Sequence, residues 1–283
     1  MKILVTGAAG QLGPECVRQL IRDGHECVGV DQNDFDLTDP QAVKAYVQSF
    51  RPDAIIHCAA WTNMEGAEEH PQRCADVNGM GTLNIVRAAL SVGAKLVYIS
   101  TAQVFSGEGS EPWRVTDRPN PRNIYGLTKA QGEEAVRSLM SRYFIVRSGW
   151  IFGASGHGFA HEILRLAGEK HTIRAAGDQI GCPTYAPDLA RLIADMVVTE
   201  NYGIYHAAGD KPCSRAQFAD ELLHRAGRAC TVRPVPVTEL SPGYRQPLNL
   251  VLDQSSLDAA GFTRLPSWQS SVDRFLWELG QRA

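Results

Sequence analysis

The sequence has no long hydrophobic run. The longest apolar stretch of the 283 residues, 54–61, contains His57 and is far shorter than the roughly 20 residues that a membrane helix needs. The chain passes from Met1 through five residues into a glycine turn at Gly7, without the apolar region and cleavage site of a secretory signal. We therefore expect no membrane span and a cytoplasmic protein.

The sequence also lacks an excess of one charge and any paired cysteine motif. Its 28 basic and 31 acidic side chains leave no electrostatic footprint for nucleic acid. Seven cysteines, none in a C-x-x-C pair, favour free thiols over disulfides or zinc. His157 and His161 are four residues apart, but the sequence offers no third ligand beside them, so we predict no metal site.

Short β-branched runs alternate with segments of helical period, which indicates an α/β fold with a doubly wound parallel (Rossmann) sheet. We expect strands at 2–6, 26–31, 54–60, 95–101 and 144–148, with helices between them that include 78–92. Less regular elements follow, with strands at 172–175, 204–207 and 231–235 and helices at 187–198, 215–226 and 268–279. The predicted division is a dinucleotide-binding domain at 1–152 and a smaller C-terminal substrate lobe at 153–283, with the chain crossing again between them.

A glycine turn directly follows the first predicted strand. Gly7 suits the tight turn, Gly10 lets the backbone approach a pyrophosphate, and Gly13 allows close packing of helix on strand. Gln11 and Leu12 lie between the last two glycines and are predicted to contact the same cofactor. The spacing is G-x-x-G-x-x-G, so a purely structural turn is the alternative interpretation.

Asp31 ends the second predicted strand, where a carboxylate can accept hydrogen bonds from an adenosine ribose. No lysine or arginine follows it directly, so a 2′-phosphate there would meet negative charge alone. NAD(H) is therefore the preferred cofactor, with NADP(H) also open. The alternative is a solvated carboxylate at a strand end.

Tyr125 and Lys129 are four residues apart, on one face of a predicted helix, and Thr101 ends the fourth strand. A tyrosine that protonates a carbonyl needs its pKa brought toward neutrality, and an ammonium about 4 Å away supplies roughly 4 kcal/mol at an effective dielectric of about 20. Thr101 would orient the carbonyl oxygen. The alternative for Tyr125 and Lys129 is an exposed pair on a helix without a catalytic role. The alternative for Thr101 is a threonine that is present only because it favours a β-strand.

These motifs together resemble the extended branch of the short-chain dehydrogenase/reductase superfamily, and within it the dTDP-4-dehydrorhamnose reductases. The matching segments are 7–13, 36–39, 58–62, 77–78, 99–101, 121–129, 147–150, 178–189 and 245–253. The resemblance implies that Thr101, Tyr125 and Lys129 are catalytic. It implies cofactor contacts at Asp31, Asp36, Leu37, Ala59, Ala60 and Asn78, and substrate contacts at Trp150, Thr184, Tyr185 and Arg245. Ala102 and Gln103, directly after the strand-end threonine, are expected to face the sugar ring.

Ala102 and Gln103 depart from the acidic residue and tyrosine that usually follow the catalytic threonine in these reductases. This stretch partly resembles sugar-nucleotide 4-epimerases and lacks the acid pair of 4,6-dehydratases. The change predicts a related 4-keto-deoxyhexose nucleotide as the best substrate.

The resulting hypothesis is an NAD(P)H-dependent reductase of the C4 keto group of a dTDP- or UDP-linked deoxysugar. Two alternatives stay open, an NAD-dependent sugar-nucleotide epimerase and a non-catalytic nucleotide-binding regulatory subunit. A homodimer also stays open.

Overall fold

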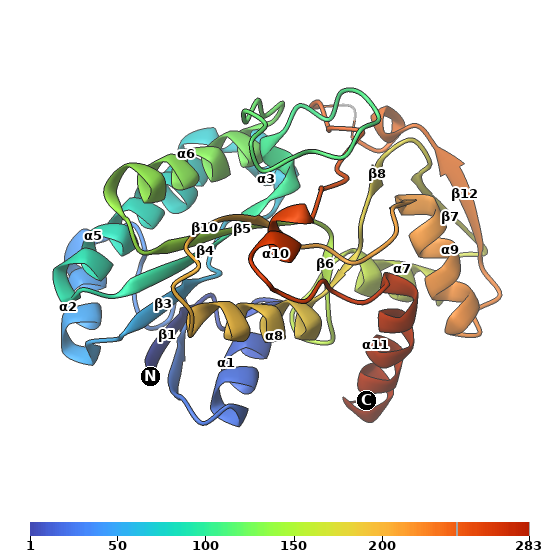
Figure 1. Ribbon diagram of the computed structural model, residues 1–283. Coiled ribbons are helices and arrows are strands. Elements are labelled where there is room, and N and C mark those ends of the chain that lie inside the picture. Colours follow the sequence, from blue (N-terminus) through green and yellow to red (C-terminus); the bar gives the residue numbers. More distant parts are fainter. Residues whose placement is uncertain (242, 283) are drawn as a thin grey trace.

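The computed structural model describes residues 1–241 and 243–282, and its largest element is a six-stranded parallel sheet (Figure 1). The strand order is β10-β5-β4-β3-β1-β2, so the chain winds outward from β1 in both directions. The strands are β1 (Lys2–Thr6), β2 (Glu26–Val30), β3 (Ala54–His57), β4 (Lys95–Thr101), β5 (Tyr143–Ser148) and β10 (Gly203–His206). The doubly wound parallel fold predicted from the sequence is confirmed.

Helices cover both faces of the sheet, and the alternation of apolar residues along each strand supplies both cores. Ile3 and Val5 pack toward one face, whereas Leu4 between them packs toward the other. The first face carries α1 (Gly13–Arg22) and α8 (Ala186–Val197). The second face carries α2 (Pro40–Phe50), α5 (Thr82–Val92) and α6 (Ile124–Leu139).

The second half of the chain returns to this sheet between two stretches that build a smaller lobe. Strand β10 pairs in parallel with β5, and α8 packs against α1. The lobe contains α7 (Phe159–Ala167), β7 (Thr172–Ala176), α9 (Arg215–Arg225), β12 (Thr231–Val235) and α11 (Trp268–Arg282). Helix α10 (Ser255–Ala259) packs instead against β10 of the large sheet. Two short ladders join β6 (Ile151–Phe152) to β9 (Thr184–Tyr185) and β8 (Ile180–Gly181) to β11 (Cys213–Ser214).

Two of the predicted boundaries that were wrong lie beside the cavity described below. Strand β3 ends at His57 and not at residue 60, because the chain then leaves the sheet to pass over Gly7. The predicted helix 78–92 begins as a π-helix at Asp76–Gly81, preceded by α3 (Met64–Glu69) and α4 (Pro71–Ala75). Wide turns of this kind are frequent at functional sites.

No helix in the described ranges combines the length and the apolar character needed to cross a bilayer. The seven cysteines are all free thiols in this structure, and four of them are buried: Cys16, Cys74, Cys182 and Cys213.

A buried ion pair ties helix α6 to the sheet. The guanidinium of Arg147, on β5, donates to both carboxylate oxygens of Glu133 at 2.8 and 2.6 Å. The hydroxyl of Ser100, on β4, donates to the same carboxylate at 2.5 Å. Both charged side chains are almost fully buried, at 1% and 2% exposure, so each depends on the other for compensation.

We expect Glu133→Gln to lower the free energy of unfolding by about 3–5 kcal/mol, because it leaves the Arg147 charge buried without its partner. Urea denaturation followed by circular dichroism measures the change. The matched control is Glu162→Gln, which removes one partner of the exposed pair with Arg165 and should change stability little. Equal stability of the Glu133→Gln protein and the unmutated protein would contradict this role.

Candidate active site

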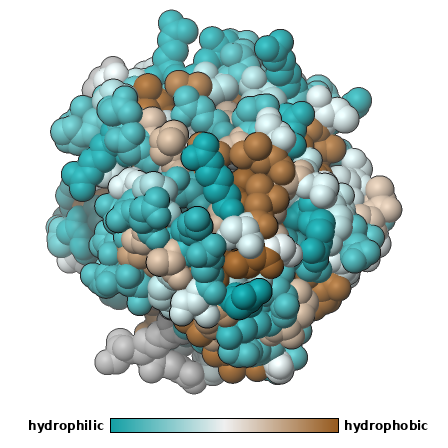
Figure 2. Space-filling view, turned by 90° about the vertical axis from the view of Figure 1, so that its left-hand side faces the viewer, coloured by the Kyte–Doolittle hydropathy of each residue, from teal (hydrophilic) through white to brown (hydrophobic). Residues whose placement is uncertain are grey.

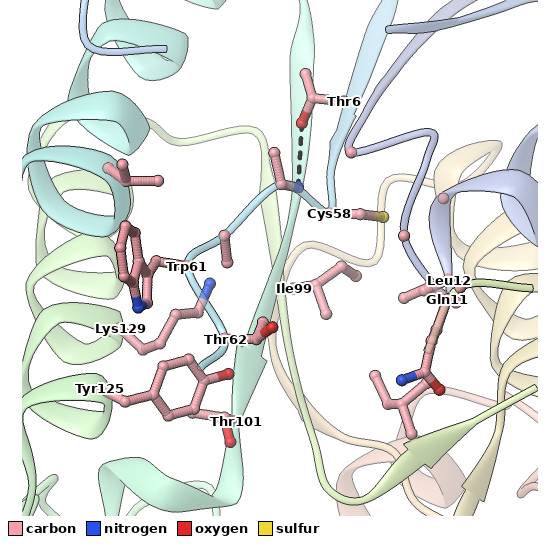
Figure 3. A pocket seen from close by; sticks show the side chains of 18 of the residues that line it. Thr6, Gln11, Leu12, Cys58, Trp61, Thr62, Ile99, Thr101, Tyr125 and Lys129 are labelled. Atoms are coloured by element: carbon pink, nitrogen blue, oxygen red, sulfur yellow. Dashed lines mark hydrogen bonds between the residues drawn. The ribbon is translucent and has the colours of Figure 1, made fainter. Parts of the chain in front are cut away.

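A cavity of about 1060 Å³ opens at the carboxyl ends of the parallel strands. The residues that follow β1, β2, β3, β4 and β5 all contribute to its lining, together with segments of the C-terminal lobe. Ligands bind at this edge in open α/β sheets. Figure 3 shows the cavity with Gln11 and Leu12 on one side and Tyr125 and Lys129 on the other.

The glycine turn is packed so tightly that side chains would not fit. Gly7 has a φ of +75°, and a Cβ added to it would lie 2.7 Å from the backbone nitrogen of Ala59. A Cβ at Gly13, where α1 begins, would lie 2.2 Å from the carbonyl oxygen of Gly7. Gly10 lines the cavity, and its N–H donates to that same carbonyl at 3.1 Å. This cradle, next to a helix N-terminus, fits a dinucleotide pyrophosphate.

A segment of the second half covers the glycine turn. The side-chain amide of Gln11 donates to the carbonyl oxygen of His157 at 2.7 Å. Gly156 approaches Gly10 so closely that a Cβ on it would lie 3.0 Å from the Gly10 carbonyl carbon. Gly10, Gln11, Leu12, Gly156 and His157 therefore form one end of the cavity.

Carboxylates mark the edge of the cavity that follows β2. Asp31 accepts a hydrogen bond from the N–H of Asn33 at 2.8 Å, and Leu37 lines the cavity beside Asp36. Hydrogen bonds from the N–H and hydroxyl of Thr38 lower the pKa of Asp36 below its ordinary value.

Arg73, on α4, lines the same cavity and adds a smaller lowering of the Asp36 pKa. Sequence reasoning missed this guanidinium, because only the fold brings α4 to the edge that follows β2. Although no lysine or arginine follows Asp31 directly in the sequence, the fold therefore brings a cation to this edge of the cavity.

The loop after β3 lines the cavity through Ala59 and Ala60, but Asn78 lies behind it. The Asn78 side chain is 1% exposed and holds the loop in place. Its amide oxygen accepts from the N–H of Trp61 at 2.7 Å, and its amide nitrogen donates to the Trp61 carbonyl at 3.1 Å. The amide also donates to the hydroxyl of Thr128 on α6, so Asn78 joins the loop to that helix.

Thr101, Tyr125 and Lys129 lie together at the cavity (Figure 3). Thr101 is the last residue of β4, and the other two lie one turn apart at the start of α6. Lys129 is 3% exposed, and its ammonium lies 4.1 Å from the centre of the Tyr98 ring. The spacing seen in the sequence therefore produces the expected cluster.

Burial dominates the ionisation of this cluster. It raises the pKa of Tyr125 to about 12, although a hydrogen bond with Thr101 opposes the change. Burial also lowers the pKa of Lys129 to about 7, opposed mainly by the negative charge of Glu133. The expectation that Lys129 would bring the Tyr125 pKa toward neutrality was wrong, because burial raises that pKa. Tyr125 stays a neutral phenol at pH 7, which is the form that a proton donor requires.

Two glycines bring α6 close enough to the sheet for this cluster to form. A Cβ on Gly126 would lie 2.2 Å from the carbonyl oxygen of Gln103. A Cβ on Gly132 would lie 2.2 Å from the hydroxyl of Tyr98. The helix begins at a defined place because the side chain of Asn123 caps it, accepting from the N–H of Gly126 at 2.7 Å.

Three of the six residues predicted to bind substrate line the cavity, namely Ala102, Gln103 and Trp150. The side chain of Gln103 is held in place, since its oxygen accepts from Asn123 at 3.0 Å and its nitrogen contacts the Met64 sulfur at 3.5 Å. Trp150 has a φ of +50°, an unfavourable value for a bulky residue, which turns the chain directly after β5.

The other three, Thr184, Tyr185 and Arg245, are not brought to the cavity. Thr184 is fully buried, and its hydroxyl donates to the Cys182 carbonyl. Tyr185 packs against Phe152 in the core of the lobe, and Arg245 lies exposed on a loop. The cavity instead receives Arg215 from α9, which the sequence did not single out.

No group of three or more potential metal ligands occurs in the part of the chain that the structure describes. His157 and His161 do lie near one another, with ring centres 6.1 Å apart.

The doubly wound sheet, the glycine cradle and the threonine, tyrosine and lysine at one cavity define an extended short-chain dehydrogenase/reductase. Within this class the chain belongs to the RmlD substrate binding domain family, whose model matches residues 1–281.

Individual relatives agree with this assignment. A dTDP-4-dehydrorhamnose reductase from Streptomyces griseus is 36% identical over 95% of this chain and 91% of its own length. The crystal structure of a dTDP-4-dehydrorhamnose reductase from Bacillus anthracis in complex with NADP has a TM-score of 0.94, with 36% identity over 98% of this chain and 99% of that one. A UDP-glucose 4-epimerase from Thermus thermophilus in complex with NAD has a TM-score of 0.85 and 26% identity over both full chains.

We expect Gly13→Ala to weaken the binding of both NADH and NADPH by at least about tenfold, because the new Cβ would displace the turn at Gly7. Fluorescence titration with each cofactor measures the change. Gly280→Ala is the control, since a Cβ there meets nothing within 4 Å. Unchanged affinity in the Gly13→Ala protein would mean that this turn does not hold the pyrophosphate.

Proposed function

We propose that this protein reduces the C4 keto group of a nucleotide-linked deoxysugar, with a reduced nicotinamide dinucleotide as cofactor. The observation that carries the proposal is that Thr101, Tyr125 and Lys129 line the same cavity as the glycine cradle. The reductase relatives from Streptomyces griseus and Bacillus anthracis support the choice of reaction and of substrate class.

Each residue of the cluster has a separate task in this reaction. Tyr125, neutral at pH 7, donates its proton to the carbonyl oxygen, and Thr101 holds that oxygen beside the phenol. Protonated Lys129 stabilises the phenolate that remains and contacts the nicotinamide ribose. The bound cofactor supplies the hydride.

The two parts of the chain would divide the binding. We propose that 1–152 holds the cofactor through Gly7, Gly10, Gln11, Leu12, Gly13 and the carboxylate edge, and that 153–283 forms most of the substrate side. Strand β10 and helix α8 return from the second part to complete the first. A nucleotide sugar would then lie between them, with Ala102, Gln103 and Trp150 on the side of the first part and Arg215 on the side of the second.

An epimerase with retained NAD is the second candidate, supported by the Thermus thermophilus relative and by Ala102 and Gln103 after the catalytic threonine. A reductase releases oxidised cofactor in every turnover, whereas an epimerase regenerates its cofactor within the cycle. Net consumption of cofactor therefore separates the two.

The test is the loss of NADH or NADPH absorbance with a panel of dTDP- and UDP-linked 4-keto-deoxysugars, dTDP-4-dehydrorhamnose included. We expect at least one member to drive stoichiometric oxidation of the cofactor. Tyr125→Phe should lower the turnover of that substrate by at least about 100-fold and leave cofactor affinity nearly unchanged. Full activity of Tyr125→Phe would contradict the mechanism, and no oxidation with any sugar would favour the epimerase or a regulatory nucleotide-binding subunit.

The rate of reduction should fall as the pH rises through about 7, because Lys129 then loses the proton that stabilises the phenolate. Tyr125 keeps its proton across this range, since its pKa is about 12. A profile of kcat against pH at saturating substrate measures the midpoint. Lys129→Arg keeps a charge at all these pH values, so its residual activity should show no such midpoint. A flat profile for the unmutated protein would contradict the role of Lys129.

We propose that NADH binds more tightly than NADPH, because the 2′-phosphate of NADPH would lie beside the Asp31 carboxylate. Arg73 moderates the difference, so both cofactors bind. Titration should show that the difference in affinity between NADH and NADPH is smaller in Asp31→Ala and larger in Arg73→Met than in the unmutated protein. Clearly tighter binding of NADPH to the unmutated protein would overturn the preference.

A further inference from the structure

Arg215 presents a positive charge to the cavity on an aromatic support. It is the first residue of α9, lines the cavity and is half-buried. Its guanidinium carbon lies 3.9 Å from the centre of the Trp150 ring and 4.6 Å from the centre of the Phe159 ring. Stacking of this kind fixes the plane of the guanidinium and leaves its edge free to donate hydrogen bonds.

Nothing in the described part of the chain neutralises this charge. The Arg215 side chain makes no hydrogen bond or ion pair there, whereas the buried Arg147 pairs with Glu133 and Arg274 pairs with Asp188. Burial lowers the pKa of Arg215 to about 9, opposed only by Cys213. A cation at the first position of a helix also meets the positive end of the helix dipole. The local structure therefore disfavours this charge, and an anion would relieve the cost.

A second donor in the same stack is also unsatisfied. The indole N–H of Trp150 is buried and has no acceptor among the described residues. The indole itself is confined, because a Cβ on Gly181 would lie 3.0 Å from two of its ring carbons. The stack is thus a fixed pair of donors without an acceptor.

The position of the stack assigns it to the substrate and not to the cofactor. Trp150 follows β5, whose Ser148 pairs with Thr101 of β4, and the adjacent Gly149 lies beside Ala102. The stack therefore stands next to the strand end that carries the catalytic threonine. The cofactor pyrophosphate already has its own cradle at the glycine turn.

Resting on the function proposed above, we propose that Arg215, supported by Trp150, binds the diphosphate of the nucleotide sugar. The diphosphate is the strongly anionic group that all members of this substrate class share, and a guanidinium can donate two parallel hydrogen bonds to it. Arg245, the arginine that the resemblance implied for the substrate, does not line the cavity.

The test uses nucleoside diphosphates as probes, so it does not require the sugar to be known. Calorimetric titrations with dTDP, UDP and uncharged thymidine compare the unmutated protein with Arg215→Met and Arg215→Lys. The matched control is Arg225→Met, on the same helix but paired with Glu221 and Asp273. NADH titration of each protein shows whether the fold and the cofactor site are intact.

We expect Arg215→Met to weaken the binding of the preferred nucleoside diphosphate by about 10- to 100-fold. The affinities for thymidine and NADH should not change, and Arg225→Met should bind the diphosphate as the unmutated protein does. Arg215→Lys keeps the positive charge but loses the two-pronged guanidinium, so its affinity for the diphosphate should lie between those of Arg215→Met and the unmutated protein. If Arg215→Met does not fold, the affinity of Arg215→Lys tests the proposal. In turnover the loss should appear in KM more than in kcat.

Three results would overturn the subsite. These are unchanged diphosphate affinity in both Arg215 variants, an equal loss of NADH affinity, or no binding of either diphosphate to the unmutated protein. The first result leaves the proposed reductase intact. Conversely, Arg215→Met could lose diphosphate binding while the unmutated protein reduces no sugar of the panel. That result would support the diphosphate subsite and contradict the proposed reductase.

Discussion

The position of helix α6 on the sheet depends on the buried ion pair between Glu133 and Arg147. The pair, extended by Ser100, holds the helix against β4 and β5, while Gly126 and Gly132 let the two backbones come close. Because Lys129 and Tyr125 lie about one and two turns before Glu133 on α6, the same contact sets their distance from the end of β4. Removing a partner would therefore affect stability and the geometry of the candidate catalytic groups together.

The cavity is built by contacts between distant parts of the chain. Gln11 bonds the backbone of His157, and Ser155 bonds both Glu15 and Arg18 of α1, so the second half closes over the glycine turn. The lobe sends Arg215 into the same space from a different element. Figure 2 shows one outer face of the molecule, on which most side chains are hydrophilic and apolar residues lie between them.

Charge is distributed unevenly along this cavity. Asp31 and Asp36 with Arg73 mark the edge that follows β2, and Lys129 lies buried near the middle beside Thr101. Arg215, which has no ion-pair partner among the described residues, supplies a further cation on the side of the lobe. Burial makes the charges of Lys129 and Arg215 strongly dependent on what is bound, because a low dielectric both raises the cost of isolated charge and strengthens a new contact.

The sequence alone was sufficient for the features that depend on local spacing: the parallel strands, the glycine turn, and a tyrosine and lysine one helical turn apart after a strand-end threonine. Side-chain environment was decided only by the tertiary structure. Packing buried Thr184 and Tyr185, put Asn78 behind a loop and raised the Tyr125 pKa to about 12 where a lowering was expected. Arg73 and Arg215 belong to no local sequence motif. They line the cavity only because folding places α4 and α9, which are far apart in the sequence, beside it. Periodicity reports which face of an element is apolar, whereas burial and electrostatic environment are set by neighbours that the chain brings together only on folding.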